Sequence, residues 1–328
     1  MTGAGEVSLS ICIVSWNTRD LLEACLRSVY ADPDSAGWQV LVVDNASSDG
    51  SADMVADRFP RAELIRSPRN LGFSRGNNLA LARATGRCLL LLNSDTAVDP
   101  GALGRLVDYL DSDPDAGAVG PRLVYPDGSL QLSCGRPPGL HSEIVHKLLL
   151  HRIFPYFRLG RWHHGERRCV GWVTGACLMV RSEAAAETGS LDPNIFMCFE
   201  DLDWCMRLRK KGWSVVYLPS SCVVHHDGQS IRKNLGEMLV VSQQSLFYLF
   251  EKHFGKGRLH ALRLLTVIEM LLRSALWILP ALLPSRRRNE GRQRLRAYRR
   301  ILRRTVTDRS YWAPLSRGAP ESTERTVR

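Results

Sequence analysis

The chain has 328 residues, 45% of them hydrophobic, which is enough for one large α/β domain plus an appendage and excludes wholesale disorder. Its formal net charge is +11, but residues 285–328 hold fourteen Arg against four acids, so the first 284 residues are nearly neutral. The nine Cys form no CxxC pair and several lie in apolar runs, which predicts buried, reduced thiols in a cytosolic protein. No secretory signal is expected, because the N-terminus lacks a basic segment followed by an apolar one.

Strands and helices alternate over the first third of the chain. Apolar runs predict strands within residues 9–17, 38–45, 61–67 and 87–95. Apolar residues at helical spacing predict helices at 18–30, after the second strand, at 71–86 with Gly86 as the stop, and after Pro100. This order predicts an α/β fold with a mostly parallel sheet and helices on both faces.

The rest of the chain is less regular. Residues 121–170 are rich in Gly, Pro and His and predict loops with little regular structure. A turn and strand at 171–181, a helix ending at Gly212, and a strand and loop up to 230 follow. From about residue 234 onward the pattern is helical, so we expect a domain at 1–230, a helical extension at 231–285 and a basic tail at 286–328.

Polar residues end each of the first four predicted strands. They are Ser15 and Asn17, then Asp44, then the loop at Asn70, then Asn93 and Asp95. In open parallel sheets, ligands bind beyond the carboxyl ends of the strands. The sequence therefore predicts one site built along this edge.

Each of these residues also has an alternative structural role. Asp95 could cap the helix after Pro100, or it could be a carboxylate ligand of a cation that binds a diphosphate. Asp44 and Asn45 could form an Asx turn, or they could hydrogen-bond the edge of a nucleotide base. Arg75 could be a solvated surface residue, or it could meet an anion at the start of a helix.

Three acids crowd the start of the predicted helix near residue 200. Glu200, Asp201 and Asp203 could simply stabilise the helix N-terminus, and Asp203 is expected to pair with Arg207 at i,i+4. Mutual repulsion in an apolar frame would raise the pKa of a carboxyl, which makes this cluster a candidate general base.

Two histidines follow the last predicted strand. His225 and His226 could be structural, as histidines at strand ends usually are. As a metal ligand, either one would supply nitrogen and favour Mn²⁺ over Mg²⁺.

Taken together, the segments resemble the family 2 glycosyltransferases, and within them the bacterial rhamnosyltransferase-like members. The resemblance covers about residues 8–230. It rests on the order and spacing of SWN, VVDNASSDGS, NLGFSRGNN, LLLLNSDT, GWVTGACLMVR, FEDLDWCMRLRKKGW and HHDGQS. It implies a GT-A fold and transfer of a sugar with inversion of configuration.

The resemblance also implies roles for single residues. Asp44 matches the acid that recognises a pyrimidine base, and Asp201 matches the catalytic base, with Glu200 as the next candidate. Asp95 matches the direct metal ligand of a DxD motif, although Asn93 stands at the first position of that motif and adds no charge. His225 or His226 matches the histidine that completes the coordination of Mn²⁺ or Mg²⁺.

Two further groups of residues complete the expected site. For the nucleotide-sugar we expect Ser15, Asn17, Asp44, Asn45, Gly72, Arg75, Asn78 and Asn93. For the acceptor we expect the wall formed by Trp172, Thr174 and Gly175.

The segment at 258–288 is apolar enough to suggest a membrane span. Arg263, Glu269 and Arg273 interrupt it, and its longest uncharged run is much shorter than the ~20 residues a span needs. Thr266, Glu269, Arg273 and Trp277 share one side of the helix, which leaves a broad apolar face. We expect an interfacial helix followed by a basic stretch attracted to anionic lipids, with a helix packed on the domain as the alternative. Nucleic-acid binding is not expected, since 286–304 lacks interleaved aromatic residues.

These observations predict a metal-dependent, inverting glycosyltransferase on the cytoplasmic face of the membrane, peripherally attached. It would use a dTDP- or UDP-sugar, with rhamnose suggested by the resemblance alone, and a lipid-linked or envelope-glycan acceptor. One alternative is an inactive sugar-nucleotide-binding module. Another is a nucleotidyltransferase on a similar sheet, although SWNTRDLL lacks the Gly of a phosphate loop.

Overall fold

The structure is a computed structural model that describes residues 7–137, 139–150, 162, 164–226, 235–283 and 288–308. The chain divides into two compact units that interleave in sequence. The first unit comprises Met1–Pro137, Trp162–Pro193 and Glu200–Ser230, and the second comprises Pro138–Arg161, Asn194–Phe199 and Ile231–Arg328. The expected loop at 227–230 and the tail beyond residue 308 lie outside the described residues.

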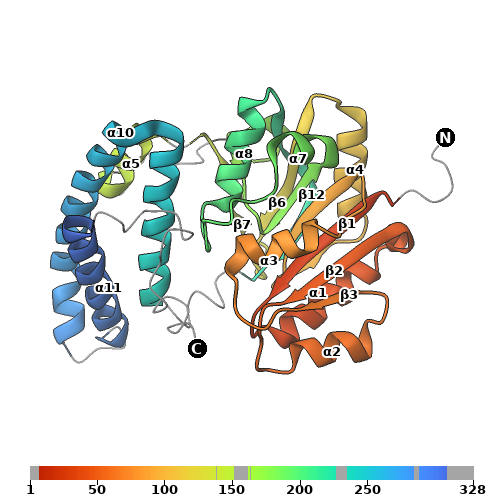
Figure 1. Cartoon of the computed structure of the whole chain (residues 1–328), viewed down its shortest axis with the longest axis horizontal. Helices are drawn as coiled ribbons and strands as arrows, with labels where there is room; N and C mark the ends of the chain where they lie inside the picture. The colour runs from red at the N-terminus through yellow and green to blue at the C-terminus, as the bar shows by residue number, and fades with distance from the viewer. Residues whose placement is uncertain are drawn as a thin grey trace. The chain divides into compact units, whose positions relative to one another are not determined.

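The first unit is built on a ten-stranded sheet (Figure 1). Its main path has the order β3-β2-β1-β4-β11-β6-β12-β5. The strands are β1 (Leu9–Ser15), β2 (Trp38–Asp44), β3 (Glu63–Arg66), β4 (Cys88–Asn93), β5 (Thr96–Val98), β6 (Ala116–Val124), β7 (Leu130–Gln131), β9 (Arg168–Cys169), β11 (Cys177–Arg181) and β12 (Ser214–His225). A separate two-stranded sheet pairs β8 (Cys134–Gly135) with β10 (Trp172–Val173).

The parallel register brings the polar strand ends to one edge of the sheet. Ser15 lies opposite Asp44, and Val14 lies opposite Asn93. On the antiparallel side, β12 pairs with β5 so that His225 lies opposite Thr96, directly after Asp95. The expected arrangement of strand ends along one edge is therefore present.

Helices cover both faces of the sheet, because alternate residues of each buried strand point to opposite faces. One face packs against α1 (Arg19–Tyr30), α2 (Ser51–Arg58) and α4 (Ala102–Ser112). The other packs against α3 (Gly72–Leu81), α7 (Ser182–Thr188) and α8 (Glu200–Lys210). A short 3₁₀ helix, η1 (Pro33–Gly37), precedes β2. The predicted mostly parallel sheet with helices on both faces is confirmed.

Three local expectations were wrong. The α3 helix ends at Leu81, and Gly86 serves a different purpose, because a Cβ there would lie 2.5 Å from the backbone nitrogen of Ser10 on β1. Residues 214–225 form a single strand with a register shift between Leu218 and Cys222 instead of a strand and a loop. The region 121–170 contains the end of β6, the strands β7 to β9 and helix α5 (Leu140–Lys147).

The second unit is helical. It contains α5, the long α10 (Leu235–Leu282), which is broken at Gly255 where φ is +79°, and α11 (Arg288–Thr307). Its apolar core is formed mainly by α10 and α11 and includes Phe247, Phe250, Leu262, Tyr298 and Ile301. The helical extension is confirmed, and part of the expected basic tail is the ordered helix α11.

The polar side of α10 faces inward. Thr266 is fully buried, and the Glu269 carboxylate accepts hydrogen bonds from Lys147 of α5 at 2.7 Å and from Arg273 at 2.8 Å. The Lys147 ammonium also donates to the side-chain oxygen of Gln243 at 3.2 Å. The opposite side of α10 is apolar and exposed at Leu264, Ile268, Leu271, Leu272, Leu276, Ile278, Leu279 and Leu282, and Leu283 directly after the helix is also exposed.

Candidate active site

Loops after β1 and β2 are tied together at the sheet edge. The Asn17 backbone N–H donates to the Ser47 hydroxyl at 3.0 Å, and the Asn17 side-chain oxygen accepts from Ser48 N–H at 2.8 Å. Asn17 has φ +54° and Ala46 has φ +64°, an unusual conformation for alanine that costs about 1–3 kcal/mol. The Ser15 hydroxyl contacts Thr18, which in turn contacts Ser94 at 2.9 Å. These contacts hold the polar side chains at this edge of the sheet in place.

The two carboxylate oxygens of Asp44 differ in their hydrogen bonding. Its residue is only 6% exposed, and its Oδ2 accepts from the Ser47 N–H at 3.2 Å. Its Oδ1 is buried and has no hydrogen-bond partner among the described residues. A buried carboxylate oxygen without a donor is costly, and this oxygen is available to accept a hydrogen bond from a ligand.

The amide of Asn45 fastens the loop that leads into α3. Its nitrogen donates to Asn70 at 2.9 Å and to the Gly72 carbonyl at 3.2 Å, while its oxygen accepts from Leu71 N–H at 2.8 Å. Gly72 has φ +78° and begins the helix. Because every polar atom of its amide is engaged in the loop, direct contact of Asn45 with a nucleotide stays a prediction.

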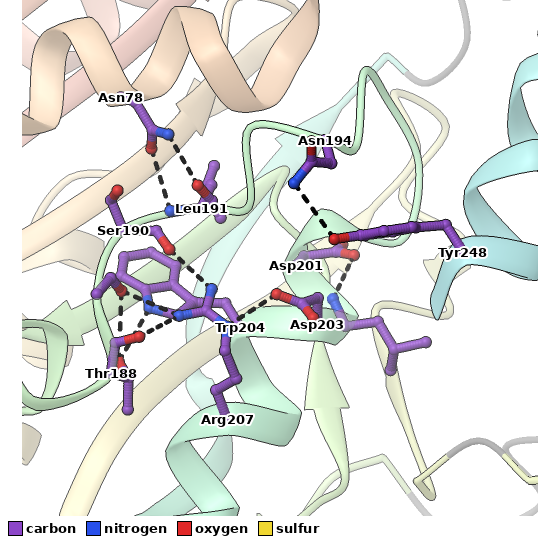
Figure 2. Close-up of polar contacts among 12 residues, drawn as sticks. Asn78, Thr188, Ser190, Leu191, Asn194, Asp201, Asp203, Trp204, Arg207 and Tyr248 are labelled. Atoms are coloured by element: carbon purple, nitrogen blue, oxygen red, sulfur yellow. Dashed lines mark hydrogen bonds and ion pairs between the residues drawn. The ribbon is translucent and has the colours of Figure 1, made fainter. Parts of the chain in front are cut away.

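Arg75 and Asn78 on α3 hold the loop after α7. Asn78 forms a two-way pair with the Leu191 backbone, donating at 2.8 Å and accepting at 3.1 Å (Figure 2). Arg75 donates through Nε to the Pro193 carbonyl at 2.9 Å. Both side chains therefore position the loop, and their nucleotide contacts also stay predictions.

Asp95 and His225 face each other across the end of the sheet. Asp95 Oδ1 lies 3.2 Å from His225 Nε2, and the two side chains are 14% and 10% exposed. Asn93 Nδ2 lies 3.3 Å from the same Nε2 atom. His226 contacts Asp95 through its backbone, where the His226 N–H donates to the Asp95 carbonyl at 2.9 Å. The geometry thus favours His225 over His226 as the partner of Asp95.

Gln131 is a functional candidate that the sequence did not reveal. Its Oε1 lies 2.9 Å from His225 Nδ1, in a buried contact. An amide oxygen only accepts, so Nδ1 is the donor in this contact, and Nε2 is the ring nitrogen that faces Asp95. Gln131 lies on β7, inside the region that predicted loops, and a strand of two residues leaves no periodic signal in the sequence that could have identified it.

The capping alternative for Asp95 is wrong. Helix α4 begins after Gly101, which is its N-cap in the left-handed conformation, and no side chain caps it. Asp95 lies instead in the turn between β4 and β5. Its carboxylate and the Nε2 lone pair of His225 repel each other unless a cation lies between them or Nε2 is protonated.

Asp201 is held by the β10–β11 turn. Its Oδ2 accepts from the Gly175 N–H at 2.8 Å, its Oδ1 accepts from the Leu202 N–H at 2.7 Å, and the Thr174 hydroxyl also hydrogen-bonds the carboxylate. Gly175 packs closely there, since a Cβ would meet Phe73 and the Asp201 Cβ at about 3.5 Å. Burial raises the pKa of Asp201 above its usual value, and the hydrogen bonds oppose this shift.

Glu200 and Asp203 play different parts on α8. Burial, and secondly the Asp201 charge, raise the pKa of Glu200 to about 8, and its Oε2 has no partner among the residues described. Asp203 is fully buried and pairs with Arg207 at 2.8 Å, as expected. Arg207 also donates to the backbone carbonyls of Thr188 and Ser190 (Figure 2). Asp203 is therefore a structural residue.

Trp172 lies on β10 opposite Gly135 of β8, and its indole ring covers that glycine, where a Cβ would lie 3.0 Å from Nε1.

Within the described residues, no three His, Cys, Asp or Glu side chains are grouped closely enough to hold a metal ion. A cation here would take Asp95 and His225 from the protein and its other ligands from a bound substrate. All nine cysteines lie in described segments and are free, and six of them are buried, whereas Cys198 and Cys222 are half-buried and Cys169 is exposed, so the expectation of buried thiols is wrong for these three.

Comparisons with known proteins agree with this geometry. A family model described as "Glycosyl transferase family 2" matches residues 10–162. The chain is 32% identical over 308 residues to the N-acetylglucosaminyl-diphospho-decaprenol L-rhamnosyltransferase of Mycobacterium tuberculosis, covering 87% of this chain and 98% of that protein. It is 25% identical over 238 residues to the rhamnosyltransferase WbbL of Escherichia coli K12, covering 67% of this chain and 85% of the other.

Solved structures show the same fold. A mannosyltransferase of Pyrobaculum calidifontis, in complex with GDP-Man and Mn²⁺, matches with a TM-score of 0.57 at 18% identity, covering 93% of this chain and 89% of the other. GalNAc-T7 with UDP, GalNAc and Mn²⁺ matches with a TM-score of 0.54 at 14% identity, covering 75% and 51%. The GT-A-type architecture is confirmed.

Proposed function

This chain belongs to glycosyltransferase family 2 and is a glycosyltransferase, and we propose that it transfers a sugar, with rhamnose as first candidate, to a lipid-linked acceptor. The M. tuberculosis relative, which matches 87% of this chain, is named an N-acetylglucosaminyl-diphospho-decaprenol L-rhamnosyltransferase. The acceptor proposed here is accordingly an N-acetylhexosaminyl diphospholipid or a related envelope glycan. Similarity to two rhamnosyltransferases from distant organisms supports the choice of rhamnose.

The donor is proposed to be a dTDP- or UDP-sugar. Asp44 supplies the supporting observation, since its buried Oδ1 has no partner in the described residues. The pyrimidine bases uracil and thymine carry a ring N–H that donates to a carboxylate. The same contact fits guanine, which also has a ring N–H. We therefore propose that the loops after β2 and before α3 select the smaller pyrimidine ring over the purine.

A donor screen tests this assignment. We expect dTDP- and UDP-sugars with Mn²⁺ to raise the melting temperature by several degrees, because a ligand at 100 times its Kd stabilises by about 2.7 kcal/mol. Asp44→Asn replaces one carboxylate oxygen, which accepts hydrogen bonds, with an amide nitrogen, which donates them. This change should abolish most of the shift in melting temperature. Thermal shift against dTDP-, UDP- and GDP-sugars measures this. A larger shift with GDP-sugars would contradict the pyrimidine assignment.

A divalent cation fits beside Asp95. The side chains there are a carboxylate, an imidazole whose Nε2 lies 3.2 Å from that carboxylate, and an outer glutamine whose side-chain oxygen lies 2.9 Å from Nδ1 of the imidazole. Such outer partners are typical of metal-binding histidines. When bound, the cation would act as a Lewis acid toward the departing diphosphate, and one carboxylate with one imidazole leaves room for phosphate ligands.

The protein's own groups account for the proton transfer. Asp201 is fixed by two backbone N–H groups, so that its orientation is set before substrate arrives. Its raised pKa makes it a stronger base than a free aspartate, at the expense of being protonated at low pH. We propose that Asp201 removes the proton from the acceptor hydroxyl while that oxygen attacks the anomeric carbon from the face opposite the leaving group. A direct displacement of this kind inverts the anomeric configuration and requires no protein nucleophile.

We also propose that the second unit attaches the enzyme to the inner face of the cell membrane. Of the described helices, α10 alone is long and apolar enough to cross a membrane. Its charged side is occupied by the Lys147–Glu269–Arg273 ion pairs, and its leucine-rich side is exposed. Helix α11 adds a stripe of exposed arginines at helical spacing, namely Arg288, Arg292, Arg296, Arg299 and Arg303. Leucines and arginines on one helical pair favour an interfacial position on anionic lipid.

Replacing leucines on α10 tests the membrane proposal. Full burial of a Leu contributes about 1.5–3 kcal/mol, so Leu271→Asp with Leu279→Asp should weaken binding to phosphatidylglycerol vesicles at least tenfold. Vesicle co-sedimentation measures the loss, and Leu79→Asp on α3, also an exposed leucine, is the matched control. Unchanged binding by the double variant would show that this face does not contact lipid.

A further inference from the structure

A cavity of about 440 Å³ lies in the first unit beside His225. Its polar lining consists of Gln131, Thr174 and His225. Its apolar lining consists of Leu123, Tyr125, Leu130 and Leu132. Ligand pockets of this size with an apolar wall and a few convergent polar groups are typical binding sites.

Two polar residues of the cavity lining are connected to the two parts of the proposed chemistry. His225 lies 3.2 Å from Asp95, where the leaving diphosphate is proposed to be held. The Thr174 hydroxyl hydrogen-bonds Asp201, and the next residue, Gly175, donates its N–H to the same carboxylate. A molecule in this cavity would therefore lie next to the candidate base and beside the site of the departing diphosphate.

The apolar lining residues lie on or next to the tight hairpin formed by β6 and β7. Strand β7 pairs with β6 so that Leu123 lies opposite Gln131. The turn between them is closed by two hydrogen bonds of 2.8 Å, from Tyr125 N–H to Ser129 and from Gly128 N–H to Tyr125. Leu132 remains 54% exposed and Tyr125 36% exposed. Leu132 and Tyr125 therefore present apolar surface in the cavity lining that a bound ligand can cover.

We propose that this cavity binds the terminal sugar of the acceptor, with Tyr125 against the ring and the leucines against an apolar substituent of that sugar. The proposal rests on the proposed function, because it takes Asp201 as the base. The polar lining residues can orient the ring hydroxyls, and the leucine wall gives a favourable environment to an N-acyl methyl group and none to a hydroxyl. The cavity would thus determine which acceptor is used, while the donor is recognised at Asp44.

Substitutions at the mouth of the cavity separate acceptor binding from donor chemistry. Leu132→Asp and Tyr125→Ala should each raise the acceptor KM at least tenfold. Both should raise the acceptor KM much more than they change the donor KM or the Mn²⁺ affinity. The Leu79→Asp variant, which adds the same charge elsewhere on the first unit, should keep the acceptor KM unchanged. The melting temperature of each variant checks folding, and Leu132 is exposed enough to accept the change.

Acceptor analogues give a second, independent readout. The unmodified enzyme should prefer an N-acetylated acceptor over its hydroxyl counterpart at least tenfold in kcat/KM, since one missing methylene in an apolar pocket typically costs about 10–200-fold. Leu132→Asp should erase most of that preference. If transfer proceeds but the acceptor KM and the preference are unchanged in both variants, the cavity does not bind the acceptor. If the unmodified enzyme hydrolyses and transfers no sugar at all, the proposed function itself fails.

Discussion

Asp201→Asn is expected to lower kcat at least about 10²-fold, because asparagine cannot accept the proton of the acceptor hydroxyl and loss of a general base typically costs ~10²–10⁴ in rate. The side chain keeps its volume, and its remaining oxygen can accept one of the N–H bonds from Gly175 and Leu202. The melting temperature and the donor affinity should therefore stay close to those of the unmodified enzyme. Steady-state transfer kinetics, with donor binding measured in parallel, test this expectation.

Asp203→Asn is the matched contrast two residues further along α8. Asp203 is fully buried and paired with Arg207, which also binds the loop carbonyls of Thr188 and Ser190. Removing this charge leaves Arg207 without its carboxylate and should cost about 3 kcal/mol of stability with little loss of turnover. If Asp201→Asn turns over like the unmodified enzyme, the base lies elsewhere, and Glu200 becomes the candidate to test.

The second large effect is expected at Asp95. Asp95→Ala removes the only carboxylate that faces His225 in the described part of the chain. Mn²⁺ affinity in the presence of nucleoside diphosphate should fall more than about 100-fold, since losing an outer-shell partner alone typically costs about 10–100-fold. Transfer should fall to background. Electron paramagnetic resonance of free Mn²⁺ measures the affinity without depending on turnover.

Gln131→Leu is expected to weaken metal binding at the same site by a smaller factor. The leucine fills similar space but accepts no hydrogen bond from His225 Nδ1, so the imidazole loses its fixed tautomer. Mn²⁺ affinity should fall about 10–100-fold, less than in Asp95→Ala. Equal metal binding by the unmodified enzyme and both variants would show that Asp95 and His225 form a simple ion pair.

The sequence predicted the sheet and its functional edge well. Buried strands such as β1 and β4 are continuous apolar runs, and in a parallel sheet their polar ends must meet at one edge. That is why Asp44, Asn93 and Asp95 could be placed together before any coordinates. Parallel register is set by the apolar pattern, so a strong pattern fixes the neighbours as well.

The residues that escaped prediction depend on contacts between distant segments. Asn45 and Asn78 were predicted as ligand contacts, which stays a prediction, and the structure adds that their amides hydrogen-bond the Leu71 and Leu191 backbones, partners that only tertiary structure reveals. Gln131 lies on a two-residue strand, too short to leave a periodic signal. The pKa argument for Glu200 named charge repulsion, whereas burial is the larger cause.

The polar side of α10 could be predicted, but its environment could not. Helical spacing places Thr266, Glu269 and Arg273 on one side, and the natural expectation is that this side faces water. In the structure, Lys147 from α5, more than a hundred residues earlier in the chain, pairs with Glu269 in the interior of the second unit. A partner that far away leaves no trace in the local pattern.

The central claim is that this enzyme transfers a sugar by inversion, with Asp201 as the base and a divalent cation at Asp95. The most direct test incubates the full-length protein with dTDP-β-L-rhamnose, Mn²⁺ and a synthetic N-acetylglucosaminyl diphospholipid, and determines the product by mass and anomeric NMR coupling. We predict one added rhamnose in the α configuration, with no product from Asp201→Asn or in excess EDTA. A β-linked product, full activity in EDTA, or no transfer from any dTDP- or UDP-sugar would contradict the claim.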